Sequence, residues 1–281
     1  MTVTATTIKV RPLSPVLGAE ITGVDLREGP DEDSREAIRQ AWYRHHMLVL
    51  PGQKLDDEHQ IRFCEIFAPV QPERLSPHLV DRKKPGVHYV ANTRPDAILP
   101  DGEIIWHSDQ PFYDLPSQAT TLFAIDVPSK GGETSFANCH LAYDELPAAM
   151  KRRLDGLRAL NAYYYNSPNR LRKATEEREP EAPRAVQPVI RTHPATGRKS
   201  IYVNRLMTDY ILDIDPAESK EILEMLFDLI EQPRFHYQHK WRVGDLVICD
   251  NRCLLHMRNT YDHVNERRTL RRITVAGDKP Y

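Results

Sequence analysis

The sequence predicts a mainly β fold, a jelly-roll barrel with a helical outer layer. Short apolar segments typical of strands recur along the chain, and only a few helical patterns lie between them. The chain has 22 prolines against 12 glycines, which indicates many rigid turns and long connections. Its 281 residues contain no internal repeat and no low-complexity segment, so we expect a single domain over residues 1–281.

The first fifty residues predict a strand, a turn, a second strand and a helix. Residues 17–26 alternate apolar with small residues, and Asp33-Ser34 is typical of a helix cap. Residues 46–50 predict a short strand, and residues 56–67 a second helix. The apolar positions expected to face the core are Ile38, Ala41 and Trp42 in the first helix, and Ile61, Cys64 and Phe67 in the second.

Strand signals dominate the remaining chain. Helices are expected near residues 141–154 and from Asp215-Pro216 onward, where a cap precedes a first-turn proline. Residues 166–187 are charged and proline-containing, with little apolar area to bury, so we expect a mobile loop or lid there. The expected strands cover residues 87–91, 104–106, 120–125, 157–163, 189–192, 200–203, 235–239, 246–249 and 270–275.

Composition excludes several classes of function. The 38 basic and 40 acidic residues leave a net charge of −2, which argues against a nucleic-acid partner. No apolar run is long enough to cross a membrane, and the N-terminal residues lack the pattern of a signal peptide. The four cysteines have no disulfide-framework spacing, so we expect reduced thiols and a cytoplasmic location.

The segment Trp106-His107-Ser108-Asp109 is the first candidate for chemistry. His107 and Asp109 are two residues apart, and on a strand this spacing places both side chains on one face. With a second imidazole they would form the facial triad that binds non-haem Fe(II). A His-x-Asp pair alone is common and is a weak signal. A hydrolase using Ser108 would need the flanking glycines of a nucleophile elbow, which are missing.

His256 is the candidate for the second imidazole. It follows the apolar segment 246–249 and the tripeptide Asp250-Asn251-Arg252. The other histidines are expected at the surface or around the site rather than as ligands. Cys249 and Cys253 have no second pair at zinc-finger spacing, so we interpret them as small buried hydrophobes.

The run of arginines near the C-terminus lies at the start of a predicted strand. Arg268, Leu270 and Arg272 would share one face of this strand. Two arginines on the inward face of a barrel strand are costly unless anions pair with them. Because a planar guanidinium suits bidentate carboxylate capture, the pair predicts anionic ligands inside the barrel.

In their order and spacing, these motifs resemble the TauD/TfdA (taurine dioxygenase-like) family of Fe(II)- and 2-oxoglutarate-dependent dioxygenases. The resemblance covers nearly the whole length, and it implies a double-stranded β-helix (jelly roll) with flanking α-helices. Each motif alone is weak, but their succession is specific. The matching segments are residues 17–26, 50–53, 106–109, Gly131-Gly132-Glu133-Thr134, 241–245, 250–256 and 267–280.

The resemblance implies a cofactor set of Fe(2+), 2-oxoglutarate and O2. His107, Asp109 and His256 would bind the iron. Thr134 and Arg268 would hold the distal carboxylate of 2-oxoglutarate. The reaction would release succinate and CO2, and the retained carboxylate at the iron predicts hydroxylation rather than halogenation.

Differences from the taurine enzymes at the expected substrate site restrict the range of candidate substrates. Residues 67–73 lack the histidine that helps those enzymes bind sulfonate, and Glu73 falls about where it would be. Ile104 and Ile105 occupy the positions at which the taurine enzymes have an asparagine. Arg272 matches the family's second arginine, which meets the anionic group of the prime substrate. We therefore expect a small organic acid with an apolar body rather than taurine, with Arg272, Glu73 and Ile105 as substrate-binding residues.

Several alternatives stay open at this point. The favoured prime substrate is a carboxylate such as an aryloxyalkanoate, ahead of a sulfate ester or phosphonate. If Glu73 faces the pocket, an amino-acid derivative would be favoured instead. Hydroxylation beside a heteroatom would lead to net cleavage. A non-catalytic anion-binding jelly roll predicts a broken ligand set, and a zinc hydrolase leaves Thr134 and Arg268 without a role. The family resemblance also implies a homo-oligomer, either a dimer or a tetramer.

Overall fold

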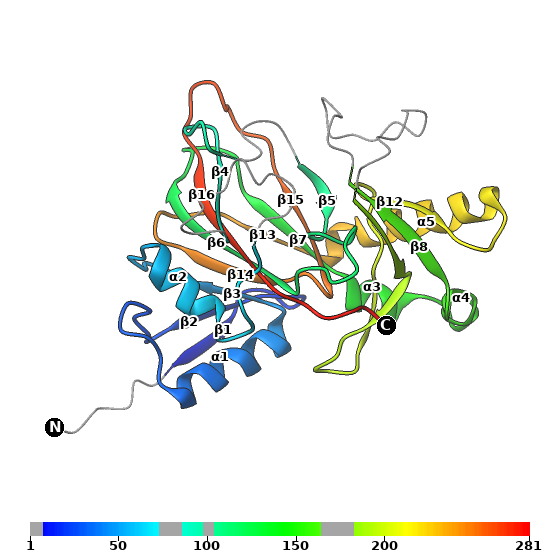
Figure 1. The fold of residues 1–281 in the computed structure, drawn as a ribbon, viewed down its shortest axis with the longest axis horizontal. Helices are drawn as coiled ribbons and strands as arrows, with labels where there is room; N and C mark the ends of the chain where they lie inside the picture. The colour runs from blue at the N-terminus through cyan, green and yellow to red at the C-terminus, as the bar shows by residue number, and fades with distance from the viewer. Residues whose placement is uncertain (1–7, 73–85, 98–103, 164–182) are drawn as a thin grey trace.

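The computed structural model describes residues 8–72, 86–97, 104–163 and 183–281 and contains two main β-sheets (Figure 1). The larger sheet has the strand order β1 (Lys9–Pro12), β2 (Ala19–Thr22), β3 (Met47–Leu50), β14 (Leu246–Asp250), β6 (Ala119–Asp126), β16 (Thr269–Val275) and β4 (Val87–Ala91). The smaller sheet has the order β13 (His236–His239), β7 (Thr134–Asn138), β15 (Leu254–Arg258) and β5 (Ile104–His107).

The two main sheets pack face to face. One buried apolar cluster takes Leu122, Val247 and Leu270 from the larger sheet, and Phe136 and Leu254 from the smaller one. Because inward-facing side chains of both sheets interdigitate, this cluster is the interior of the barrel. The expected jelly roll is therefore formed, and the candidate ligands lie on or directly after strands that border this interior.

Helices cover the outer faces of the sheets, as Figure 1 shows for α1 (Glu32–His45) and α2 (Asp57–Cys64) beside the larger sheet. The core-facing residues Ile38, Ala41 and Trp42 of α1 are buried as predicted. On the side of the smaller sheet lie α3 (Cys139–Glu145), α4 (Ala148–Leu154), α5 (Pro216–Ile230) and the 3-10 turn η2 (Pro233–Phe235). Here α5 buries Ile222, Leu223, Leu226, Phe227 and Ile230.

Two small sheets complete the described chain. One has three strands in the order β12 (Thr208–Ile211), β8 (Arg158–Ala162) and β9 (Arg184–Pro188), and the other pairs β10 (Ile190–Thr192) with β11 (Lys199–Ile201). Residues 184–187 were expected in a mobile loop, but they belong to β9. Their backbone groups pair with β8, and this pairing overrides their polar composition. The earlier part of that segment, up to residue 182, lies outside the described residues.

Three helix predictions were wrong in detail, and one of them concerns the second helix, which ends at Cys64 and leaves Phe67 beyond it. The first helix begins at Glu32 because the carboxylate of Asp31, rather than Asp33-Ser34, caps it by accepting from the Ser34 backbone amide at 2.8 Å. The single helix expected near residues 141–154 is two helices. Pro147 disfavours a helical backbone at the residue before it, and Leu146 is extended there, with ψ of 137°.

Strand β16 confirms the alternation predicted for the arginines. Arg268, Leu270 and Arg272 face a pocket between the sheets. Arg271 faces the other side of the sheet, where its guanidinium contacts the side chains of Gln60 and Asp57, both in α2. Within the described residues, no helix is long and apolar enough to span a bilayer, and all four cysteines are buried and free.

Candidate active site

His107 and His256 face each other across two neighbouring strands. His107 is the last residue of β5 and lies directly opposite His256 of β15 in the antiparallel register. Their ring centroids are 4.3 Å apart. The ladder between β5 and β15 therefore fixes the separation of the two imidazoles, which residues far apart in the sequence provide.

Asp109 joins the two histidines, although not in the way the sequence predicted. We expected Asp109 to continue the strand of His107, but β5 ends at His107 and Asp109 lies two residues beyond its end. The next residue, Gln110, has a φ of 63°, so the chain turns sharply there. The ligand atoms of His107, Asp109 and His256 nevertheless lie within 4.8 Å of one another, and all three residues are buried.

The carboxylate of Asp109 has a defined set of partners. Arg272 Nη2 lies 3.0 Å from Oδ1, and Thr120 Oγ1 donates to Oδ2. Asn251 Nδ2 in turn donates to Thr120 Oγ1 at 3.0 Å. Burial would raise the pKa of Asp109, but the positive charge of Arg272 and the neighbouring imidazoles outweigh it and hold the pKa well below its usual range. Asp109 is therefore a carboxylate that cannot pick up a proton near neutral pH.

The hydrogen bonding of His107 and the burial of His256 suit metal binding. Nδ1 of His107 lies 2.8 Å from the carbonyl oxygen of Ile105, so Nδ1 carries a proton and Nε2 is the nitrogen that could bind a metal. Burial, followed by the neighbouring His107 imidazole, lowers the pKa of His256 to about 3. Nδ1 of His256 is buried, and no described residue offers it a hydrogen bond. Two neutral imidazoles and one carboxylate fit a divalent metal ion with open coordination positions.

A pocket between the two sheets begins at this triad. Arg268 is buried in its wall, and its Nε donates to the carbonyl oxygen of Gly132 at 3.0 Å. Thr134 begins β7, and its hydroxyl accepts from Trp241 Nε1 at 3.0 Å. The lining residues are Val90, Ile104, His107, Asp109, Thr120, Leu122, Thr134, His256, Arg258, Arg268, Leu270 and Arg272.

Gly132 explains why the Gly131–Thr134 motif carries glycine next to the arginine. Its φ is 68°, and a Cβ atom there would lie 3.2 Å from Cδ and Nε of Arg268. Only glycine takes this conformation at little cost while it leaves room for the guanidinium. The motif thus positions the arginine that faces the pocket.

Arg268 is a buried cation without an ion-pair partner among the described residues. Burial, followed by the charge of Arg258, lowers the pKa of Arg268 to about 9. A buried guanidinium in this state is stabilised by any anion that enters the pocket. Arg268, directly before β16, and Arg272 within it therefore differ, because Arg272 has a protein carboxylate beside it and Arg268 has none among the described residues.

Some pocket residues were not anticipated from the sequence. Arg258 lines the pocket from β15, two residues after His256, and the period of two along a strand could have identified it. Ile104, rather than the predicted Ile105, lines the pocket, because an irregularity in the pairing of β5 with β15 shifts the register between His256 and Arg258. Glu73 lies outside the described residues.

Comparison with known proteins identifies the family. Residues 9–274 match the family model described as taurine catabolism dioxygenase TauD, TfdA family. The chain belongs to the TauD/TfdA family. This membership confirms the predicted jelly-roll fold and the predicted class of enzyme, an Fe(II)- and 2-oxoglutarate-dependent dioxygenase.

This TauD/TfdA chain is similar to its relatives over nearly their full length. It is 32% identical to the (S)-phenoxypropionate/alpha-ketoglutarate-dioxygenase of Sphingobium herbicidovorans, over 96% of this chain and 95% of the relative. A taurine dioxygenase from Burkholderia xenovorans superposes with a TM-score of 0.82 at 28% identity, over 97% and 90% of the two chains. AAD-2 in complex with Mn(II) and N-oxalylglycine gives 0.79 at 29% identity, over 98% and 99%.

Proposed function

We propose that this dioxygenase hydroxylates a small organic acid with an apolar body, and that the pocket described above is its active site. His107, Asp109 and His256 hold the iron. Thr134 and Arg268 hold the distal carboxylate of 2-oxoglutarate. With iron and 2-oxoglutarate bound, the centre would use O2 as the oxidant for C–H hydroxylation, while 2-oxoglutarate is converted to succinate and CO2.

The observation that carries this proposal is the position of Arg268. Its buried guanidinium has no acidic partner among the described residues, and it faces the same pocket as a complete set of metal-ligating groups. A purely structural arginine would be expected to meet a carboxylate of the protein. A dicarboxylate that chelates a metal at one end needs a cation for its other carboxylate. The triad and Arg268 together meet both needs.

The residues around the pocket favour an anionic prime substrate with an apolar body. Arg258 and Arg272 add positive charge, while Val90, Ile104 and Leu122 supply apolar wall. A carboxylate such as an aryloxyalkanoate fits both features, and the similarity to a phenoxypropionate dioxygenase supports it. Hydroxylation of the carbon beside an ether oxygen gives a hemiacetal-like product that breaks down, so the net reaction on such a substrate is cleavage.

Turnover of matched substrates tests this proposal. Succinate release would be measured for phenoxyacetate, for the neutral phenoxyethanol of similar shape, for an alkyl sulfate and for taurine. We expect phenoxyacetate to stimulate succinate formation, and phenoxyethanol and taurine to have little effect. Stimulation by phenoxyethanol equal to that by phenoxyacetate would contradict the role of the substrate anion. If only the alkyl sulfate stimulated succinate release, the substrate would be a sulfate ester rather than a carboxylate.

The remaining expectations concern the state of the protein. A dimer or tetramer in the cytoplasm is proposed on the family resemblance and on the reduced state expected for the four buried thiols. Light scattering of the purified protein checks the assembly, because a monomer across the micromolar range would contradict it.

A further inference from the structure

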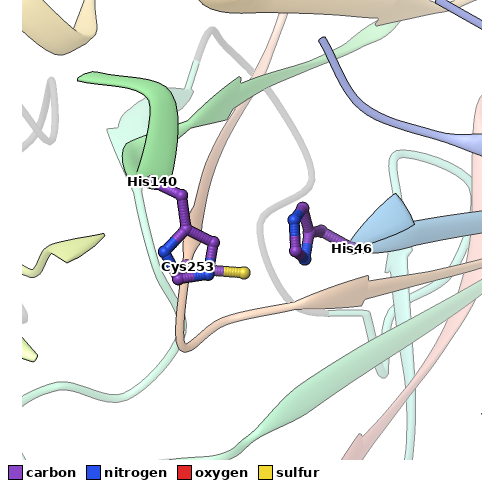
Figure 2. Close-up of side chains that lie close together, drawn as sticks. All are labelled: His46, His140 and Cys253. Carbon is purple, nitrogen blue, oxygen red and sulfur yellow. The ribbon is translucent and has the colours of Figure 1, made fainter. Parts of the chain in front are cut away.

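A second cluster of metal-ligating side chains lies apart from the triad. His46 lies between α1 and β3, His140 is the second residue of α3, and Cys253 lies in the turn between β14 and β15. Figure 2 shows Sγ of Cys253 pointing toward the ring of His46, with His140 beside it. The three ligand atoms lie within 4.8 Å of one another, and all three residues are buried.

Two ring nitrogens in this cluster lack a hydrogen-bond partner among the described residues. Nδ1 of His46 and Nε2 of His140 are buried and unpaired, and the two residues are 3% and 0% exposed. Leaving such polar atoms unpaired in the interior costs about 1–3 kcal/mol each. These unpaired atoms therefore indicate a ligand that the described protein atoms do not provide.

The protonation of His140 matches what a metal requires. Its Nδ1 lies 2.8 Å from the carbonyl oxygen of Lys199, so Nδ1 holds the proton and Nε2 the lone pair. Metal-binding histidines commonly donate their other ring N–H to a backbone carbonyl in this way. Burial, as the first cause in each case, lowers the pKa of His46 to about 3 and that of His140 to about 4. Both rings are therefore neutral at physiological pH.

A neighbouring cluster that shares Cys253 is satisfied without a metal. Nε2 of His193 lies 2.9 Å from Oδ2 of Asp250, and its Nδ1 accepts from two backbone amides at 3.3 Å. The carboxylate of Asp250 also accepts two hydrogen bonds from the Arg252 guanidinium, at 2.8 and 2.7 Å, and one from the Arg252 backbone amide at 3.0 Å. Every ligand atom of His193 and Asp250 is thus occupied, which places the available donors on His46 and His140.

From these contacts we propose that His46, His140 and Cys253 form a second metal site, distinct from the iron site, for zinc or a similar cation of borderline softness. Two imidazoles and one thiolate are a donor set that zinc binds tetrahedrally, with a fourth position for water or another ligand. On binding, the Cys253 thiol releases its proton to solvent and the thiolate bonds to the metal. Small rotations of the side chains bring the donors to ordinary bonding distances.

The location gives the second metal a structural role. His46 precedes β3 in the larger sheet, and α3 follows β7 of the smaller sheet, while Cys253 leads directly into β15. A metal bound there ties both sheets to the turn three residues before His256. It therefore acts as a positioning element for the strand that carries an iron ligand.

Cobalt provides a test that separates the two sites. The full-length protein is produced in medium supplemented with Co²⁺, so that the buried site fills during folding, and cobalt per chain is then measured. We expect two cobalt ions per chain. We also expect a near-ultraviolet thiolate-to-cobalt charge-transfer band, which the triad cannot give because it contains no sulfur.

Variants assign the cobalt count and the charge-transfer band to the individual sites. Cys253→Ser should lose the charge-transfer band and one cobalt, whereas Cys64→Ser, the loss of another buried thiol, should keep both. His107→Ala should keep the band while it loses the other cobalt. Should Cys253→Ser not fold, X-ray absorption on the wild-type protein decides, since a sulfur neighbour at about 2.3 Å from cobalt is expected. One cobalt per chain, without a thiolate band or sulfur neighbour, overturns the second site and leaves the proposed dioxygenase site unaffected.

Discussion

Nη2 of Arg272 lies 3.0 Å from Oδ1 of Asp109 at the centre of the pocket. The family resemblance implies that Arg272 meets a substrate anion, and in the structure it also meets a carboxylate of the protein itself. This ion pair keeps Asp109 ionised in a buried site and fixes one of its two oxygens. Arg272 therefore orients a proposed iron ligand as well as adding positive charge to the pocket wall.

Thr120 should prove necessary for metal affinity. Thr120→Val removes the hydroxyl that donates to Oδ2 of Asp109, so one carboxylate oxygen loses its orienting partner. Loss of such a partner typically weakens metal binding about 10- to 100-fold. Fe(II) affinity would be measured by anaerobic calorimetry. Thr121→Val is the matched control, because that hydroxyl bonds to Gln60 and the Ile273 backbone, away from the pocket. Equal losses in both variants would refute the proposed role.

Arg268→Met should raise the KM for 2-oxoglutarate by about 10- to 100-fold, which matches the roughly 1.5–3 kcal/mol of a hydrogen bond to a charged group. Metal binding should change little, since Arg268 contacts none of the three ligands. Steady-state kinetics at saturating Fe(II) measures the effect. The control is Arg267→Met, which removes a neighbouring arginine whose side chain is 73% exposed. An unchanged KM in Arg268→Met would contradict its assignment to 2-oxoglutarate.

Ile104 and Ile105 offer a neighbouring pair for testing the substrate pocket. Ile104 lines the pocket, whereas Ile105 does not. Ile104→Ala should lower kcat/KM for the prime substrate roughly tenfold or more through lost apolar contact, and Ile105→Ala should have a much smaller effect. Competition assays with an apolar carboxylate compare the two variants. The reverse order would restore the sequence-based assignment to Ile105.

The buried pair of Arg252 and Asp250 should contribute strongly to stability. Burial would raise the pKa of Asp250, but Arg252 and His193 hold it well below its ordinary value. Arg252→Met leaves this carboxylate buried with one fewer cation and should lower the free energy of unfolding by about 3–5 kcal/mol. Urea titration at neutral pH measures the loss. A loss below about 1 kcal/mol would show that the pair is not stabilising.

The same pair should give a characteristic pH dependence. A carboxylate whose folded pKa is depressed contributes stability above its unfolded pKa, and this contribution is lost as the pH falls through the folded pKa. The unfolded value for Asp250 is near 3.8. The stability difference between wild type and Arg252→Met should therefore narrow as the pH drops below about 4. A difference that widens in acid would contradict this assignment.

Local sequence patterns predicted the outer parts of this molecule well. The spacing of Ile38, Ala41 and Trp42 identified the buried face of a helix, and the period of two on β16 separated Arg268 and Arg272 from Arg271. These patterns predict the buried positions because each element packs one face against a single neighbour.

The same patterns failed where the barrel interior is polar. Strands β7 and β15 were not predicted, although they carry Thr134 and His256, because polar residues that face the pocket break the apolar alternation. The shift that brings Ile104 to the pocket depends on strand pairing, which spacing along one strand does not encode. The cluster of His46, His140 and Cys253 is equally a product of tertiary contacts, since no spacing links its members.

Anaerobic addition of Fe(II) and 2-oxoglutarate to the metal-free protein tests the central claim most directly. If His107, Asp109 and His256 hold iron while Arg268 and Thr134 hold 2-oxoglutarate, a weak visible charge-transfer band should appear only when both are present. His107→Ala should abolish the band, and Arg268→Met should shift it to higher 2-oxoglutarate concentrations. Absence of the band in the wild-type protein, or its persistence in His107→Ala, would contradict the proposed active site.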